Sequence, residues 1–129
     1  MDLQAIETNL AVVRRVCEAW HELTLDEFRT LCDPTIDYRN IPIDGDQHLG
    51  PDEAHAVLSR FAQKWAIRLR VDNIVGDERV VMTERTEFFE HRAGTRPAFA
   101  LPVMGTFELR DGKVTAWRDY FELSHMHLR

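Results

Sequence analysis

The sequence predicts an α+β domain in which helices precede a run of antiparallel strands. Apolar residues recur with helical spacing up to residue 65, and alternation with a period of two replaces that pattern from residue 67 onward. A chain of 129 residues is long enough for one hydrophobic core, so we expect residues 1–129 to form a single domain. A strongly curved antiparallel or mixed sheet packed on three N-terminal helices would then form a cone with a pocket inside.

Three helices are predicted before the strands. The first is long and amphipathic, because apolar residues recur every three or four positions along it. These residues are Leu3, Ile6, Leu10, Val13, Cys17 and Trp20. Thr24 and Glu27 form a capping-box pattern that starts a second, short helix, and residues 33–35 (Asp-Pro-Thr) should end it. Pro51 and the two acidic residues after it favour the start of a third helix. Its apolar stripe consists of Ala54, Val57, Leu58, Phe61 and Trp65.

The strands begin between the second and third helices. Residues 36–40 alternate as a short strand, and residues 41–50 read as a loop. After the third helix, the alternating pattern predicts strands at roughly 67–75, 79–91, 97–109 and 114–123.

The turn at residues 110–112 (Arg-Asp-Gly) joins the last two strands, and its length decides which residues face each other. A two-residue turn would place Asp119 opposite Met104. A three-residue loop would instead place Asp119 opposite Val103. We prefer the three-residue loop, in which Gly112 is left-handed, because it pairs apolar residues of the two strands with each other.

Composition and charge argue against several classes of function. A net charge of -6 without a lysine or arginine cluster makes nucleic acid an unlikely partner. The longest apolar runs are too short to span a bilayer, and the N-terminal residues lack the pattern of a secretory signal. Cys17 and Cys32 both fall in helical apolar patterns, and we interpret them as reduced core residues of a cytoplasmic protein.

Charged residues on apolar strand faces mark a candidate site. Asp119 shares a face with the aromatic residues Trp117 and Phe121, where an unpaired carboxylate would cost several kcal/mol. Arg85 and Glu87 share a face of the strand at 79–91. An arginine fork can bind both carboxylates, so that one stays ionised as a base while the other is protonated as an acid.

Three segments, taken together, resemble the limonene-1,2-epoxide hydrolases. They are YRNIP at 38–42, TERTE at 83–87 and WRDYFEL at 117–123. These enzymes are members of the cone-shaped superfamily that includes nuclear transport factor 2, ketosteroid isomerase and SnoaL-type cyclases. The resemblance extends over essentially the whole chain. It implies a nuclear transport factor 2-like fold and a homodimer, in which the outer sheet face is the plausible interface.

The resemblance also implies roles for five residues. Asp119 matches the base that activates a water, Arg85 the bridging arginine, and Tyr38 and Asn40 the groups that hold the water. Glu87 falls on the acid that protonates the epoxide oxygen, although the family usually has aspartate there. The implied reaction is a single addition of water by general acid and base catalysis, with no metal and no organic cofactor.

An apolar pocket would bind the substrate, which the resemblance implies to be a small terpene-like or cyclic epoxide. The residues expected to line it are Phe61, Trp65, Ile67, Phe89, Leu101, Val103, Trp117 and Phe121.

The same residues also have interpretations without catalysis. Arg85, Glu87 and Asp119 could form a structural ion-pair network. Tyr38 could be a core tyrosine, and Asn40 could be a turn residue before Ile-Pro. The pocket aromatics line a pocket only if the cone is hollow.

Two other functions stay open at this point. An isomerase or cyclase of the same superfamily would also place an acid inside the cone, and a non-catalytic protein could bind small apolar ligands there. His125 and His127 would share a strand face if the last strand extended that far, and they could then hold a metal, although no acid lies near them in the sequence pattern.

Overall fold

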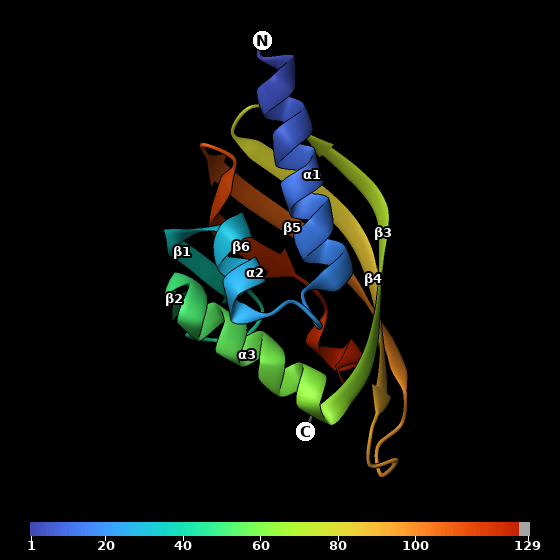
Figure 1. Cartoon of the computed structure of the whole chain (residues 1–129). Coiled ribbons are helices and arrows are strands. Elements are labelled where there is room, and N and C mark those ends of the chain that lie inside the picture. Colours follow the sequence, from blue (N-terminus) through green and yellow to red (C-terminus); the bar gives the residue numbers. More distant parts are fainter. Residues whose placement is uncertain (127–129) are drawn as a thin grey trace.

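A computed structural model describes residues 1–126 and confirms the α+β class (Figure 1). The elements follow in the order α1 (Leu3–Ala19), α2 (Leu25–Leu31), β1 (Cys32–Asn40), β2 (His48–Leu49), α3 (Gly50–Lys64), β3 (Trp65–Gly76), β4 (Val80–His91), β5 (Phe99–Arg110), β6 (Lys113–Tyr120) and the 3₁₀ turn η1 (Leu123–His125).

The strands form one mixed, curved sheet in the order β2-β1-β6-β5-β4-β3. All neighbours pair antiparallel except β1 and β6, which are parallel. The three α-helices cover one face of the sheet, and the two edge strands do not pair with each other, so the cone stays open (Figure 1). Within the described residues, no helix combines the length and the apolar composition that crossing a membrane requires.

Most helix signals in the sequence correspond to real ends and faces, but Leu3 of the predicted first stripe is exposed and Trp65 of the predicted third stripe begins β3. Thr24 and Glu27 form the predicted capping box, in which each side chain bonds the other residue's backbone N–H. The end of α2 differs from the prediction, because β1 begins at Cys32 and Cys32 therefore lies in a strand. Pro34, which has no N–H to donate, is tolerated because it falls in the irregular stretch of β1 between the paired residues Cys32 and Asp37.

The turn between β5 and β6 corrects the predicted register. It is a two-residue turn with Arg110 paired to Lys113 and with positive φ at both Asp111 (53°) and Gly112 (73°). The register then shifts by one residue because Thr115 is an extra, bulged residue of β6. The predicted three-residue loop is therefore wrong.

As a result, Asp119 lies opposite Gly105, and not opposite Val103 or Met104. The last strand also ends at Tyr120, so Phe121 is not paired with Leu101 as the three-residue loop would require.

The core lies between the helices and the covered face of the sheet. Its fully buried side chains include Val13 and Phe28 from the helices and Phe107 and Trp117 from the sheet. Polar residues are buried in the same layer on three strands, namely Asn40 on β1, Thr83, Arg85 and Glu87 on β4, and Asp119 on β6. This polar group inside an apolar core is the candidate site.

Candidate active site

Arg85 and Asp119 form a buried bidentate ion pair that crosses the sheet. Arg85 projects from β4 and Asp119 from β6, with β5 between them. The guanidinium donates from Nη1 to Oδ1 at 3.0 Å and from Nη2 to Oδ2 at 2.7 Å, and both side chains are at least 94% buried. Such fork-to-fork pairing fixes the orientation of both groups as well as their distance.

The bridge passes over Gly105, which pairs with Thr83 on one side and Asp119 on the other. A Cβ at this position would overlap Arg85 Nη1 and come within 2.7 Å of Asp119 Oδ1. Glycine is therefore required at position 105 because a larger side chain would clash with the ion pair, and not because of its backbone conformation.

We predict that Gly105→Ala destabilises the protein by about 2 kcal/mol, because overpacking forces the ion pair apart. Urea unfolding measures the effect. A wild-type free energy of unfolding would contradict the close approach of the ion pair to β5.

Glu87 binds the same arginine from the other side. Its Oε2 accepts from Arg85 Nη2 at 3.1 Å and from the indole Nε1 of Trp20 at 3.3 Å. Among residues 1–126, no donor bonds its Oε1. Burial raises the pKa of Glu87 above its ordinary value, and the nearby Asp119 carboxylate adds to this rise, although Arg85 opposes it.

The two acids are therefore not equivalent. Asp119 accepts two hydrogen bonds from Arg85 and a third from the indole of Trp117 at 2.8 Å. Within the described residues, Glu87 accepts on one oxygen only, and its pKa is raised. Two carboxyl groups in such different environments can divide the roles of a base and an acid between them.

Tyr38 and Asn40 lie beside the acids because β1 runs parallel to β6. Tyr38 pairs with Trp117 and Asn40 with Asp119. The Tyr38 hydroxyl lies 3.3 Å from Asn40 Oδ1 and 3.2 Å from Asn40 Nδ2. Burial raises the pKa of Tyr38 well above its ordinary value, so the phenol keeps its proton and can donate it in a hydrogen bond.

Asp46 fixes the orientation of Asn40. Its Oδ2 accepts from the Asn40 backbone N at 2.8 Å and from Nδ2 at 3.1 Å, while His48 Nε2 lies 3.0 Å from its Oδ1. A carboxylate can only accept hydrogen bonds, so the amide atom of Asn40 that contacts Asp46 must be the nitrogen Nδ2. The amide oxygen Oδ1 is then the acceptor beside Tyr38. No sequence pattern marks Asp46, because a loop residue carries no periodic signal for its contacts.

A small cavity lies against these groups. Its volume is about 30 Å³, which is room for about two water molecules and far less than the roughly 300–1,000 Å³ of ligand pockets. Of the predicted pocket residues, five line it, namely Phe61, Phe89, Leu101, Val103 and Phe121. Trp20, Leu58 and Met126 also line it and were not predicted. An organic substrate therefore needs side chains of this wall to move.

Three predicted pocket residues lie outside the cavity lining. Trp65 and Ile67 line two other hollows, each of which shares one lining residue with the cavity. Trp117 is covered by the rings of Tyr38 at 4.3 Å and Phe107 at 5.3 Å. Face alternation alone did not separate positions in the cone's interior from positions deeper in the core.

A cysteine nucleophile and a metal site both have less support in the structure. Burial raises the pKa of the Cys17 thiol to about 12, which disfavours a thiolate nucleophile. In the part of the chain described, no three His, Cys, Asp or Glu side chains gather where they could hold a metal ion. His125 lies in the turn η1 and not in a strand, and its suggested partner His127 lies outside the described residues.

The fold is similar to that of solved structures described as SnoaL-like or NTF2-like. A putative SnoaL-like polyketide cyclase from Jannaschia sp. CCS1 superposes with a TM-score of 0.80 at 18% identity, covering 93% of this chain and 89% of that one. An LEH-like epoxide hydrolase of Mycobacterium tuberculosis superposes with a TM-score of 0.77 at 23% identity, covering 94% and 87%.

The chain belongs to the limonene-1,2-epoxide hydrolase family. Residues 7–128 match the model of the limonene-1,2-epoxide hydrolase catalytic domain. Epoxide hydrolase EphG of Mycobacterium tuberculosis is 34% identical over 70 residues, which are 54% of this chain. The match spans 45% of the length of that relative.

Proposed function

We propose that the protein hydrolyses a small, largely apolar epoxide to a vicinal diol. One observation carries the proposal: Arg85 bridges two acids of unequal hydrogen bonding beside a cavity of about 30 Å³, which has room for about two waters. Membership of the limonene-1,2-epoxide hydrolase family supports the same reaction.

The proposed reaction is one concerted step. A water held by the Tyr38 hydroxyl and Asn40 Oδ1 gives a proton to Asp119 while its oxygen attacks one epoxide carbon. The carbon–oxygen bond breaks, and Glu87 delivers its proton to the departing oxygen. Return of a proton from Asp119 to Glu87 restores the site, and Arg85 neutralises one negative charge throughout. General acid and general base each contribute on the order of 100- to 10,000-fold.

A single-turnover experiment tests the mechanism. Enzyme in excess over a panel of epoxides is placed in H₂¹⁸O, and the diol of the first turnover is analysed by mass spectrometry. Direct attack by water puts ¹⁸O into that diol. Unlabelled diol in the first turnover would indicate an ester with an enzyme carboxylate, and absence of diol from every epoxide would contradict the proposed activity.

A second function fits the same geometry. A protonated Glu87 could donate a hydrogen bond to an enolate oxygen while Asp119 removes a carbon-bound proton, as an isomerase or cyclase requires. The SnoaL-like fold of structural neighbours favours keeping this alternative. Deuterium uptake from D₂O into a ketone substrate, without diol formation from epoxides, would support it. Binding of such ligands without turnover would indicate a non-catalytic binding protein.

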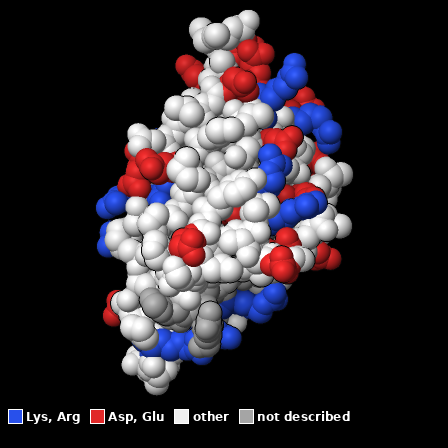
Figure 2. All heavy atoms as spheres, turned by 180° about the vertical axis from the view of Figure 1, so that it is seen from behind, with Lys and Arg blue, Asp and Glu red and all other residues white. Residues whose placement is uncertain are grey.

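We also propose a homodimer formed through the outer face of the sheet. Figure 2 shows a broad uncharged area on this face, with charged side chains around and within it, and large apolar side chains are exposed on four neighbouring strands, namely Val75, Met82, Met104 and Tyr120. Contiguous exposed apolar surface is typical of an interface. The free, buried thiols of Cys17 and Cys32 support a reducing, cytoplasmic location.

Met104→Lys is therefore expected to give a monomer, because it places a charge at the centre of the apolar face. Sedimentation equilibrium measures the mass of the variant and of wild type. The control is Leu3→Lys, since Leu3 is also exposed but lies at the start of α1. A wild-type monomer, or a dimer that survives Met104→Lys, would contradict the proposed interface.

A further inference from the structure

A groove of about 320 Å³ lies next to the catalytic cavity. Apolar side chains from α3 and the start of β3 form one part of its lining, and polar or charged side chains form the rest. The lining residues are Asp46, His48, Val57, Arg60, Phe61, Lys64 and Trp65. Phe61 lines both the groove and the cavity, so this one side chain belongs to the wall between them.

Phe61 is free enough to move. It is only partly buried. Phe89, which lines both the cavity and a second hollow, is buried, stacks on Phe99 at 4.9 Å and meets the edge of Trp65 at 6.2 Å. A rotation of Phe61 would join the cavity to the groove and give a pocket in the usual size range of ligand sites. The groove is therefore the expected position for the part of the substrate that does not react.

The charges of the groove favour an anion. Arg60 and Lys64 are exposed, stand four residues apart on α3, and have no acidic partner among the described residues. Like charges at this spacing destabilise a helix. Asp46 does not relieve them, because its carboxylate already binds Asn40 and His48.

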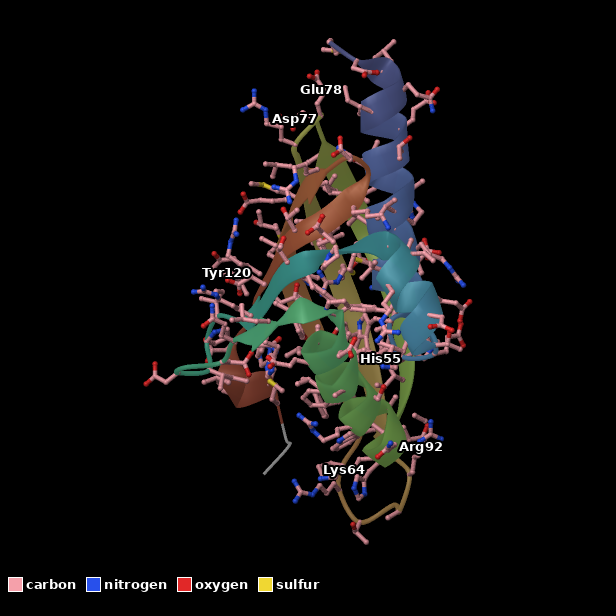
Figure 3. The ribbon with its side chains drawn as sticks, turned by 60° about the vertical axis from the view of Figure 1, so that its left-hand side comes forward. His55, Lys64, Asp77, Glu78, Arg92 and Tyr120 are labelled. Carbon is pink, nitrogen blue, oxygen red and sulfur yellow. The ribbon has the colours of Figure 1, made fainter. Side chains whose placement is uncertain are left out.

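A third cation lies at the same end of the molecule. Figure 3 shows Lys64 and Arg92 where α3 ends, and the Arg92 backbone N donates to the Lys64 carbonyl at 3.0 Å. The helix macrodipole favours basic residues at this end. It does not explain why two of them border the groove beside Phe61 in a chain of net charge -6.

We propose that this groove binds the carboxylate of an amphipathic substrate, an epoxide that carries an acid at the end remote from the oxirane. The carboxylate lies between Arg60 and Lys64, the apolar part passes Phe61, and the oxirane reaches Glu87 and Asp119. This inference rests on the proposed epoxide hydrolase function and specifies its substrate class.

The test compares 7,8-epoxyoctanoate with its methyl ester, which has the same chain without the charge. The measured quantity is the ratio of kcat/KM for the acid to kcat/KM for the ester. We expect wild type to prefer the acid, and Arg60→Gln/Lys64→Gln to lower the ratio about tenfold, as two partly exposed ion pairs allow. Salt at 0.5 M should lower the ratio in wild type through screening.

The control is Arg79→Gln/Lys113→Gln, which removes the same two charges outside the groove lining. Its ratio should equal that of wild type. A wild-type ratio near one, or an unchanged ratio in Arg60→Gln/Lys64→Gln, would overturn the groove proposal and leave the hydrolase proposal intact. The two single variants replace the double variant if its melting temperature shows misfolding.

Binding of octanoate separates this inference from the proposed activity. Octanoate binding is measured by the change in tryptophan fluorescence, because Trp65 lines the groove. The part of the signal that comes from Trp65 is the part that Trp65→Phe removes. If no epoxide is hydrolysed but the double variant binds octanoate about tenfold more weakly than wild type, the anion site stands and the hydrolase proposal fails. Equal binding by both proteins overturns the anion site.

Discussion

Asp119→Asn is expected to lower epoxide hydrolysis by at least about 100-fold, because an amide cannot accept the proton of the attacking water. The substitution should also impair Glu87, the proposed general acid. Without the Asp119 charge, Glu87 becomes the only carboxylate on Arg85 and is then favoured in its ionised form. Steady-state rates of diol formation measure the combined effect.

The variant should still fold. Breaking a buried ion pair lowers the free energy of unfolding by about 3 kcal/mol, within the roughly 5–15 kcal/mol of a typical domain. Urea unfolding checks this expectation. Asp111→Asn is the matched control, since it makes the same change in the exposed turn of the same hairpin, where asparagine also accepts positive φ. Near wild-type activity of folded Asp119→Asn would rule out Asp119 as the base.

Glu87→Gln should be nearly inactive, with a loss on the order of 100-fold or more. Glutamine keeps the length of the side chain and an oxygen that can accept from Arg85 and Trp20, so the packing of the site is preserved. It cannot deliver a proton to the epoxide oxygen. Diol formation across a panel of epoxides is the measurement, and Glu90→Gln, exposed on the same strand, is the control.

Glu87→Asp separates the chemistry from the length of the acid. Aspartate restores the residue that the family usually has, so measurable activity should remain. The carboxyl group retreats by about 1 Å and leaves the Trp20 indole at 3.3 Å out of reach. A change in the ratio of the two regioisomeric diols would report this retreat. If Glu87→Gln hydrolyses epoxides as fast as wild type, Glu87 is not the acid.

Local signals in the sequence predicted the helices and the charged candidate site. The capping box at Thr24 involves neighbouring residues only. Asp119 and Arg85 were noticeable because charges on apolar strand faces need partners, and their pairing follows from the cost of burying either one alone.

Non-local geometry explains what the sequence did not predict. The bulge at Thr115, which sets the register of Asp119, leaves no mark in the alternating pattern. Trp20 was recognised only as the last residue of an apolar stripe, although its indole contacts Glu87 from another element. The small cavity volume depends on how side chains fill the cone, which periodicity does not describe.

The parallel pairing of β1 with β6 has a consequence for folding. It is the contact that sets Asn40 beside Asp119, two residues separated by most of the chain. Contacts of such long range carry the largest loop-closure cost and tend to make folding slow. During refolding, Asp119 can meet Tyr38 and Asn40 only when this pairing forms. Recovery of enzymatic activity would therefore report the joining of the two distant strands, whereas helix formation would report only local order.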